Sequence, residues 1–492
     1  MLFNSIEYIF FLPIVFAIYW LLRNHLRLQN LFVVLASYVF YGWWDWRFLI
    51  LIAFTSFCSW GSGLLIHRTL YTVHHTPESR TPYTLHRTLS PKFWMVANIV
   101  INLGILATFK YYDFFVSEFG ALFGISTESL LLRIILPVGI SFYTFQALSY
   151  SIDVYRGNNK PTRDIVAFFA FISFFPQLVA GPIERATNLL PQFLQKRTFS
   201  YEQGVDGMRQ ILWGLFKKIV VADNCAMYVD QVWSTYDTHS GSTLLLAAIL
   251  FTFQIYGDFS GYSDIAIGTA KLFSIKLMRN FNNPYFSRDI AEFWRRWHIS
   301  LTSWFRDYVY IPLGGSRPNV VCSVRCTVEG KKKLIVARNV MIVFLICGLW
   351  HGANWTYLVW GLYNVLLFLP LILLGKSKRY KDSPLVWKQL PQMLLTFILV
   401  TLGWIIFRAP SLPDAWGYMC SMTNLSGAAP SLPITQWVGI IFGLLTMIAF
   451  EWTYCNSDHA PIPHRWWIYY LLIAAIWWYA PSFSTDFIYF QF

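Results

Sequence analysis

Long apolar runs constrain this chain more than any other feature. Stretches of about 18 or more predominantly apolar residues, the length that crosses a bilayer as a helix, recur from one end of the sequence to the other. Only 13% of the 492 residues are charged, against about 25% in soluble domains, so most of the surface needs a solvent other than water. We therefore predict an all-α polytopic membrane protein with a single integral membrane domain over residues 1–492.

Positive charges between the runs predict the topology. Arg23 and Arg27 follow the first apolar run, and Lys and Arg also crowd residues 67–92 and 279–338, so these loops are expected to be cytoplasmic. The N-terminus is then outside, and the first run is a retained span because no positive residue precedes it. The net charge of +13 reflects this topology, and no nucleic-acid partner is expected. About eleven or more spans are expected, among them 8–22, two within 31–66 that turn near 43–46, 93–109, 131–150, 392–408, 434–452 and 466–481.

Two apolar stretches are interrupted by polar and helix-breaking residues. Proline and glycine interrupt residues 175–185, and glycines with two aspartates interrupt residues 256–268. Broken helices are tolerated at membrane depth where they are buried in protein or line a cavity. These stretches are either interfacial loops or, because both carry polar groups, re-entrant segments around a central chamber.

Two histidines occur where a lipid-embedded chain rarely has an ionisable group. His298 lies in the run FWRRWH at 293–298, and His351 lies in CGLWHGANW at 347–355. Ionisable groups at membrane depth are costly and usually face a cavity or a substrate path. Both histidines are therefore candidate functional residues.

A helix over residues 294–308 would place His298 in a polar row, opposite an aromatic face. The aromatic face contains Trp294, Trp297, Leu301, Trp304 and Tyr308, and the polar row contains Arg295, His298, Thr302 and Arg306. The neighbouring arginines would depress the pKa of His298 and keep its ring neutral at pH 7. An interfacial amphipathic helix would also explain the tryptophans and arginines, but not a histidine between them.

His351 has small and aromatic neighbours. Gly348 and Gly352 let another backbone or a substrate come close to the helix, and Trp350 and Trp355 favour a desolvated, neutral ring. A neutral imidazole in a dry pocket can take a proton from a hydroxyl as its oxygen attacks an acyl carbonyl. The alternative is a core histidine that is hydrogen-bonded to a neighbouring helix.

Other kinds of site find little support in the sequence. The two histidines lack an evident third metal ligand, and the pair Cys322 and Cys326 in a basic loop has no partner pair. The chain has no Walker A loop, no HExxH and no GxSxG motif. We expect no metal and no bound cofactor, and direct transfer of an acyl group to a hydroxyl, assisted by histidine, is the simplest mechanism.

These motifs resemble the membrane-bound O-acyltransferase (MBOAT) family, and most closely its bacterial alginate O-acetyltransferase branch. The matching segments are FWRRWH at 293–298, WFRDY at 304–308, IPLGG at 311–315, GLWHG at 348–352, DFSGYSD at 258–264, FPQLVAGP at 175–182, MLFNS at 1–5 and ASYVFY at 36–41. The resemblance spans most of the chain and is strongest from residue 130 to residue 365, whereas the loop 316–338 departs from it.

The resemblance implies a ring of membrane helices, with re-entrant or interfacial helices, around a central tunnel. It implies that His351 is the catalytic histidine and that His298 occupies the second polar position of the active site, where it orients the acyl donor or polarises its carbonyl. The further residues expected to bind donor or substrate are Trp294, Arg295, Trp297, Ser300, Trp304, Arg306, Asp307, Trp350 and Asn354.

The resemblance also implies partners. The acyl group, acetyl in this branch, would come from a cytoplasmic donor such as acetyl-CoA or an acyl carrier protein, and the basic surface of residues 279–338 suits an anionic donor. An extracytoplasmic SGNH-type acetyltransferase would complete the transfer to an exported, alginate-like polysaccharide, with this chain in the bacterial inner membrane.

Two alternatives remain open. D-alanyl transfer or peptidoglycan O-acyl transfer would use the same fold, although IPLGG at 311–315 favours the alginate branch over the D-alanyl one. A proton-coupled transporter could also use buried histidines, but such a protein is expected to contain paired internal repeats, and none is visible here.

Overall fold

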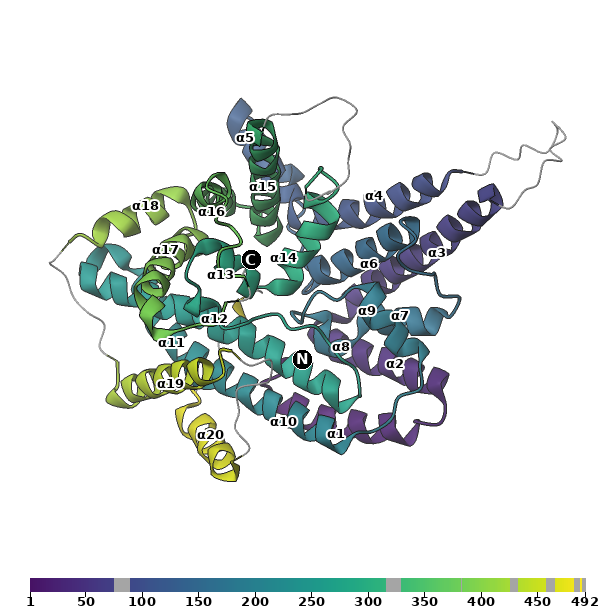
Figure 1. The fold of residues 1–492 in the computed structure, drawn as a ribbon, viewed down its shortest axis with the longest axis horizontal. Helices are drawn as coiled ribbons and strands as arrows, with labels where there is room; N and C mark the ends of the chain where they lie inside the picture. The colour runs from purple at the N-terminus through teal and green to yellow at the C-terminus, as the bar shows by residue number, and fades with distance from the viewer. Residues whose placement is uncertain are drawn as a thin grey trace. The chain divides into compact units, whose positions relative to one another are not determined.

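The computed structural model describes residues 1–74, 89–315, 329–381, 383–424, 432–456, 465–481 and 487–488. Every secondary-structure element assigned within these ranges is a helix, which confirms the all-α prediction (Figure 1). The chain forms two compact units, Met1–Met208 with Ala266–Met278 and Arg209–Ile265 with Arg279–Phe492. Helices α10 (Tyr201–Leu215) and α12 (Gly241–Leu272) each contribute residues to both units.

Seven helical stretches of the described residues are long and apolar enough to cross a membrane. They are Leu26–Leu70, Pro91–Lys110, Gly241–Leu272, Lys333–His351, Trp355–Leu373, Trp387–Arg408 and Ile434–Thr453. Two shorter helices, Ile6–Leu21 and Trp466–Tyr479, are also apolar. The chain is therefore a polytopic membrane protein, as predicted.

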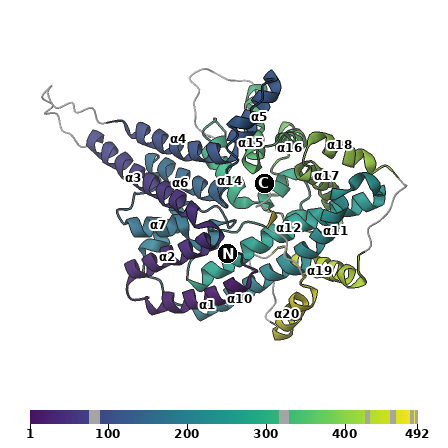
Figure 2. The ribbon, with the colours of Figure 1, turned by 180° about the vertical axis from the view of Figure 1, so that it is seen from behind.

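In the first unit, α2, α3, α4, α6 and α7 pack side by side, as two opposite views show (Figures 1 and 2). The elements of this unit are α1 (Ile6–Leu21), α2 (Leu26–Asp45), η1 (Trp46–Phe48), α3 (Leu49–His74), α4 (Pro91–Lys110), α5 (Tyr112–Phe123), η2 (Glu128–Leu130), α6 (Ile140–Tyr155), α7 (Ile165–Ser173), α8 (Phe175–Leu178) and α9 (Ala186–Leu194). The turn η1 lies close to the turn predicted near residues 43–46. By contrast, α6 begins at residue 140 rather than at the predicted 131.

The predicted interruption at residues 175–185 is present. The short helix α8 ends at Leu178, and an irregular segment leads from there to α9. Residues 175–184 are all buried. The broken helix is thus enclosed by protein, the setting in which a membrane protein tolerates one.

The predicted interruption at residues 256–268 is wrong, because α12 runs through this stretch without a break. Its glycines permit close packing against the π-helical segment η3 (Phe216–Ala222) and the end of α10. A Cβ atom at Gly257 would lie 3.0 Å from the Lys217 carbonyl oxygen, and one at Gly261 would lie 2.7 Å from the Gly214 carbonyl oxygen. These glycines therefore bring two helices together and do not end one.

The aspartates of the same stretch form ion pairs with η3, in which Asp258 is buried and Asp264 is half-buried. Lys217 Nζ lies 2.5 Å from Asp264. Lys218 Nζ lies 2.7 Å from Asp258 and 2.8 Å from Asp223. Buried charges are tolerated when they are paired, so these groups join α12 to η3.

The second unit contains α15 and α16 as an antiparallel pair, with α17 packed against α16. Its elements after η3 are α11 (Asp223–Ser234), η4 (Tyr236–Thr238), most of α12, η5 (Pro284–Phe286), α13 (Ile290–Arg296), α14 (Ile299–Phe305), η6 (Arg306–Tyr310), α15 (Glu329–His351), α16 (Trp355–Leu373), η7 (Trp387–Gln389), α17 (Leu390–Arg408), α18 (Leu412–Ser421), α19 (Ile434–Thr453) and α20 (Trp466–Tyr479). Both candidate histidines belong to this unit.

Candidate functional site

The prediction of one continuous helix over residues 294–308 is wrong. α13 ends at Arg296, α14 begins at Ile299, and η6 continues as a π-helical turn. His298 lies at the break with φ +43°, a conformation that is uncommon for residues other than glycine and costs about 1 to 3 kcal/mol. The predicted polar row around His298 therefore does not form.

Backbone hydrogen bonds to the preceding segment hold this break in place. The Ile299 N–H donates to the Asn280 carbonyl at 2.8 Å, and the Asn282 N–H donates to the Arg296 carbonyl at 2.9 Å. The His298 carbonyl accepts from the Thr302 N–H at 3.0 Å and so begins α14. Periodicity within 294–308 could not reveal the break, because its partners lie outside that window.

The His298 side chain is only 1% exposed and contacts an amide and a serine. Its Nδ1 lies 3.1 Å from Asn280 Oδ1, and the Ser300 hydroxyl donates to the same oxygen at 2.8 Å. The Phe259 ring packs edge-on against the imidazole at 4.7 Å between centroids. Burial lowers the pKa of His298 to about 3, so the ring is neutral as predicted. The cause is desolvation and not the neighbouring arginines.

His351 is the last residue of α15 and is buried among aromatic rings. Its ring centroid lies 5.2 Å from that of Trp360 and 5.1 Å from that of Phe407, both nearly perpendicular. Gly348, one turn earlier, lies against the Tyr357 backbone. The absence of a side chain at this position therefore allows close approach of α16, which is another backbone and not a substrate. The helix end is therefore held rigidly against the next helix.

Trp350 brings the two histidines into one site. Its ring centroid lies 6.0 Å from that of His298 and 4.9 Å from that of His351. The histidines, 53 positions apart in the chain (351 − 298), thus contact the same indole.

A cavity of about 580 Å³, which we call the α15 cavity, is lined by residues close in the chain to both histidines, although neither imidazole is among its wall residues. Its wall includes Ile299, which follows His298, and Cys347, one turn before His351. The rest of the wall is mainly apolar, with Val340, Val343, Phe344, Phe368 and Ile372 from α15 and α16. Its cationic side chains are Arg295, Arg306, Lys378 and Lys381.

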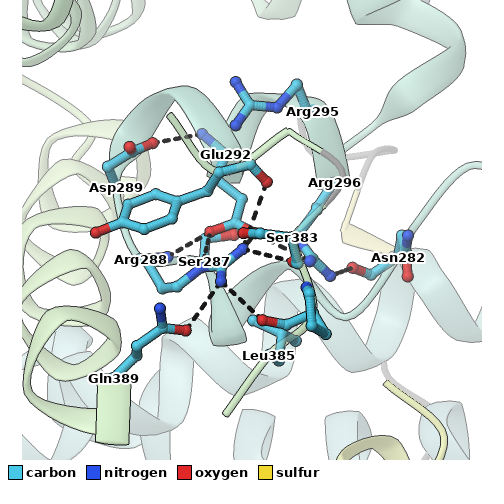
Figure 3. Close-up of polar contacts among 12 residues, drawn as sticks. Asn282, Ser287, Arg288, Asp289, Glu292, Arg295, Arg296, Ser383, Leu385 and Gln389 are labelled. Carbon is cyan, nitrogen blue, oxygen red and sulfur yellow. Dashed lines mark hydrogen bonds and ion pairs between the residues drawn. The ribbon is translucent and has the colours of Figure 1, made fainter. Parts of the chain in front are cut away.

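Arg295 and Arg288 attach the connection between α16 and α17 to α13. The Arg295 Nη1 donates to the Ser377 carbonyl at 2.7 Å, whereas its buried Nη2 has no hydrogen-bond partner among the described residues. The Arg288 side chain is fully buried and donates to the Pro384 carbonyl at 3.0 Å. It also donates to Gln389 Oε1 at 2.9 Å (Figure 3). These contacts set the position of Lys378 and Lys381 at the cavity.

Glu292 neutralises Arg296 of α13 and Arg288, which lies just before α13. Its carboxylate lies 2.8 Å from Arg288 Nη2 and 2.9 Å from Arg296 Nη2 (Figure 3). Burial acts to raise the pKa of Glu292, but hydrogen bonds from Arg288 and the charge of Arg296 hold that pKa below its ordinary value. Asp289 completes the cluster, because its side chain accepts from the Glu292 N–H at 2.7 Å and caps α13.

The predicted tryptophans form part of the aromatic packing around the site. Trp294 donates from Nε1 to Asn364 Oδ1 at 3.3 Å and lines the α15 cavity. Trp297 and Trp404 are both buried, and their ring centroids lie 5.0 Å apart. Trp304 packs at 5.0 Å from Tyr308.

Of the remaining predicted residues, Arg306 lies at the α15 cavity, whereas Asn354 lies at the start of α16. Arg306 pairs with Asp307 at 2.7 Å, and the Arg306 side chain is largely exposed. Asn354 caps α16 by accepting from the Thr356 N–H at 3.0 Å, and it donates to the Pro410 carbonyl at 2.8 Å. Both Asn354 hydrogen-bonding groups are thus used to hold the end of α16 in place.

Several residues of the site were not predicted. Asn280, Phe259 and Phe407 contact the histidines from distant positions of the chain. Phe259 lies in the DFSGYSD segment noted above, but nothing in the local sequence marks it or the other two as partners of a histidine. Arg288 and Glu292 were visible as charges in an apolar protein, a signal that could have singled them out.

No group of three or more His, Cys, Asp or Glu side chains suited to a metal ion occurs among the residues that the structure describes. Cys322 and Cys326 lie outside those residues.

Comparisons with known proteins show the family of this chain. Residues 162–406, which contain both histidines, match the MBOAT, membrane-bound O-acyltransferase family. The probable alginate O-acetylase AlgI of Pseudomonas aeruginosa is 38% identical over 421 residues, which cover 85% of this chain and 74% of that protein. The peptidoglycan O-acetyltransferase of Helicobacter pylori is 34% identical and covers 87% of this chain and 81% of its own length.

A more distant relative is the teichoic acid D-alanyltransferase of Bacillus subtilis, 28% identical over 279 residues, which cover 55% of this chain and 68% of that protein. The similarity is thus greater, and covers more of the chain, for the O-acetylating relatives than for this D-alanylating one. With its helices, its paired histidines and these relatives, the chain belongs to the membrane-bound O-acyltransferase family and is a membrane O-acyltransferase.

Proposed function

We propose that this protein transfers an acetyl group from a cytoplasmic thioester donor, across the bacterial inner membrane, toward an exported cell-envelope polysaccharide. It would act as one acyltransferase domain over residues 1–492. The observation that carries the proposal is the α15 cavity, which combines an apolar wall, a cationic set of side chains and the neighbourhood of both histidines.

The cavity suits a donor with an anionic group and an apolar arm. Lys378 and Lys381 supply positive charge, and the buried Nη2 of Arg295 offers a further hydrogen-bond donor to a phosphate oxygen. Phosphopantetheine, which coenzyme A and acyl carrier proteins share, supplies the phosphate, and its methyl and methylene groups can contact the apolar wall. The thioester would then lie near Ile299 and Cys347, next to the histidines.

His351 is assigned as the general base. It would take the proton of the acceptor hydroxyl as the oxygen attacks the thioester carbonyl carbon. The C–O bond forms, the tetrahedral intermediate collapses, the C–S bond breaks and the thiolate receives the proton from His351. The aromatic rings around His351 exclude water, which favours transfer to the acceptor over hydrolysis.

For His298, the hydrogen bonds favour one of the two expected roles. Asn280 Oδ1 accepts from the Ser300 hydroxyl, so the amide oxygen faces His298, and the imidazole Nδ1 must carry the proton that it donates to that oxygen. In a neutral ring Nε2 is then a hydrogen-bond acceptor. In this tautomer, Nε2 can accept a hydrogen bond from an N–H or O–H group of the acetyl-carrying substrate, but it cannot donate one to the thioester carbonyl. The orienting role is therefore favoured over the polarising role.

The names of the relatives suggest the acceptor, and the partner is proposed from the family resemblance alone. Alginate is the polymer named for the P. aeruginosa relative, and an alginate-like polysaccharide is therefore our first acceptor. Peptidoglycan, named for the H. pylori relative, is the second. An SGNH-type acetyltransferase outside the membrane would complete the transfer.

Transfer of labelled acetyl in proteoliposomes tests the proposal. Wild type should release free thiol from acetyl-CoA or from an acetyl-loaded carrier protein and pass the label to an added acceptor. His351→Gln should lower turnover by about 100-fold or more, the usual contribution of general acid–base catalysis. His239→Gln, which changes another buried histidine of the second unit, is the matched control and should leave turnover unchanged. Full activity of a folded His351→Gln protein would refute the assignment.

A further inference from the structure

The second unit contains another cavity that the proposed reaction does not use. It has a volume of about 580 Å³, lies between α12, α17 and α19, and we call it the α19 cavity. Its wall includes Phe253, Tyr256, Phe397, Leu445, Glu451 and Trp452. This volume is in the range of sites that hold small molecules.

The α19 cavity is polar at one end and apolar along the rest. At the polar end, Trp387 and Trp452 pack at 4.0 Å between ring centroids. There the Glu451 carboxylate accepts from the Tyr256 hydroxyl at 2.7 Å. Lys388, which follows Trp387 in η7, is exposed and is not itself a wall residue, so its long side chain lies within reach of this end. Tryptophan and lysine are the residues that membrane proteins place at the level of lipid headgroups.

The apolar part has the length of one lipid leaflet. Phe397 lies ten residues beyond Trp387, which corresponds to about 15 Å along a helix. That is half of the hydrocarbon thickness of about 30 Å. A cavity that begins at the headgroup level and continues for this distance matches one acyl chain of a phospholipid.

The cavity is also open to the bilayer. α12, α17 and α19 all belong to stretches that are long and apolar enough to cross a membrane. Among the wall residues, Leu394 is 52% and Leu445 is 64% exposed. Because these side chains belong to membrane spans, hydrocarbon is the medium that covers them.

We propose that the α19 cavity binds one acyl chain of an anionic membrane phospholipid, with the phosphate beside Lys388 and the glycerol region beside Trp387 and Trp452. The site is independent of the acyl-transfer reaction. Its inner wall nevertheless reaches the catalytic segment, because Tyr256 packs against Trp297, the residue before His298, at 6.1 Å between centroids.

Photolabelling tests the proposal with the full chain in nanodiscs. The probe is phosphatidylglycerol with a diazirine in its acyl chain, and cross-linked peptides are identified by mass spectrometry. Peptides of α17 and α19 that line the cavity should be labelled about tenfold more strongly than peptides of α20. The helix α20 is the reference for non-specific contact with lipid, because its Trp477 is 87% exposed. Equal labelling of all three helices would overturn the proposal.

Two variants separate the cavity from the outer surface of the same helix. Ala449→Trp fills the cavity and should abolish the excess labelling, and Leu394→Trp is a second filling variant should the first fail to fold. Ile441→Trp, on α19 but outside the cavity, is the matched control and should keep the excess. Undiminished labelling of folded filled variants, or equal labelling by phosphatidylcholine, would contradict an anionic lipid site.

Discussion

At the scale of single residues, the proposed role of His298 rests on Asn280, which would keep the imidazole proton on Nδ1. Its Oδ1 accepts from the Ser300 hydroxyl and lies 3.1 Å from the imidazole Nδ1. Asn280 has no contact with substrate in this assignment, so it is a positioning residue. Its effect should therefore depend on whether position 280 offers a hydrogen-bond acceptor.

Asn280→Ala should lower kcat/KM for the acyl donor by about tenfold, since a lost hydrogen bond of about 1 to 1.5 kcal/mol no longer fixes the tautomer. Asn280→Asp keeps an acceptor for the Nδ1–H and should retain more activity than the alanine variant. Steady-state kinetics with both variants, normalised to folded protein, measures the difference. Equal losses in the two variants would mean that position 280 supports only the fold.

The ion pairs of Glu292 make the free energy of unfolding fall at low pH. Its pKa is depressed in the folded protein, so its ion pairs contribute fully above its ordinary pKa of about 4.3 and are lost as pH falls through the lower folded value. Glu292→Gln should lower the melting temperature at pH 7, because breaking a buried pair costs about 3 to 5 kcal/mol. The difference in melting temperature between wild type and Glu292→Gln should become smaller as pH falls below about 4.5. Thermal unfolding of both proteins in detergent between pH 3.5 and 7 measures this difference. A gap that is constant with pH would contradict the ionic role of this carboxylate.

At the scale of elements, the sequence predicted well those helices whose signal lies within them. The span near 434–452 is α19, and the span near 392–408 is α17, because continuous apolar composition is a local property. The predictions that failed concern contacts with distant segments. The break at His298 depends on backbone bonds to Asn280 and Asn282. Likewise, the glycines of α12 suggest interruption until the neighbouring η3 is known.

The close packing in α12 yields a direct test. Gly261→Ala places a methyl group against the Gly214 backbone carbonyl, which cannot move aside as a side chain would. We expect the free energy of unfolding to fall by about 1 to 3 kcal/mol, as at other overpacked sites. Gly104→Ala, in the apolar helix α4 with nothing near its Cβ position, is the matched control and should be neutral or stabilising. Thermal unfolding of both variants measures this, and equal stability would show that α12 and η3 are not tightly packed.

At the scale of the whole molecule, the sequence predicted the class of protein and singled out two histidines, which contact the same indole, but it did not predict the α15 cavity beside them. The class follows from composition, and the histidines stand out because charge is rare at membrane depth. The α15 cavity, by contrast, is made by side chains from α13 to α16 and by the connection that Arg288 and Arg295 hold. Its cationic side should face the cytoplasm if the donor enters there.

The orientation in the membrane is therefore the prediction on which the donor route depends. In a background without the seven native cysteines, Glu118→Cys should react with a membrane-impermeant maleimide added to intact spheroplasts. Lys376→Cys, at the end of α16 near the cationic side chains of the α15 cavity, should react only after the membrane is opened. Positive charges follow the first run and crowd residues 67–92 and 279–338, so the positive-inside rule favours this result. Labelling of Lys376→Cys in intact cells would place the cationic cavity outside and would exclude a cytoplasmic donor.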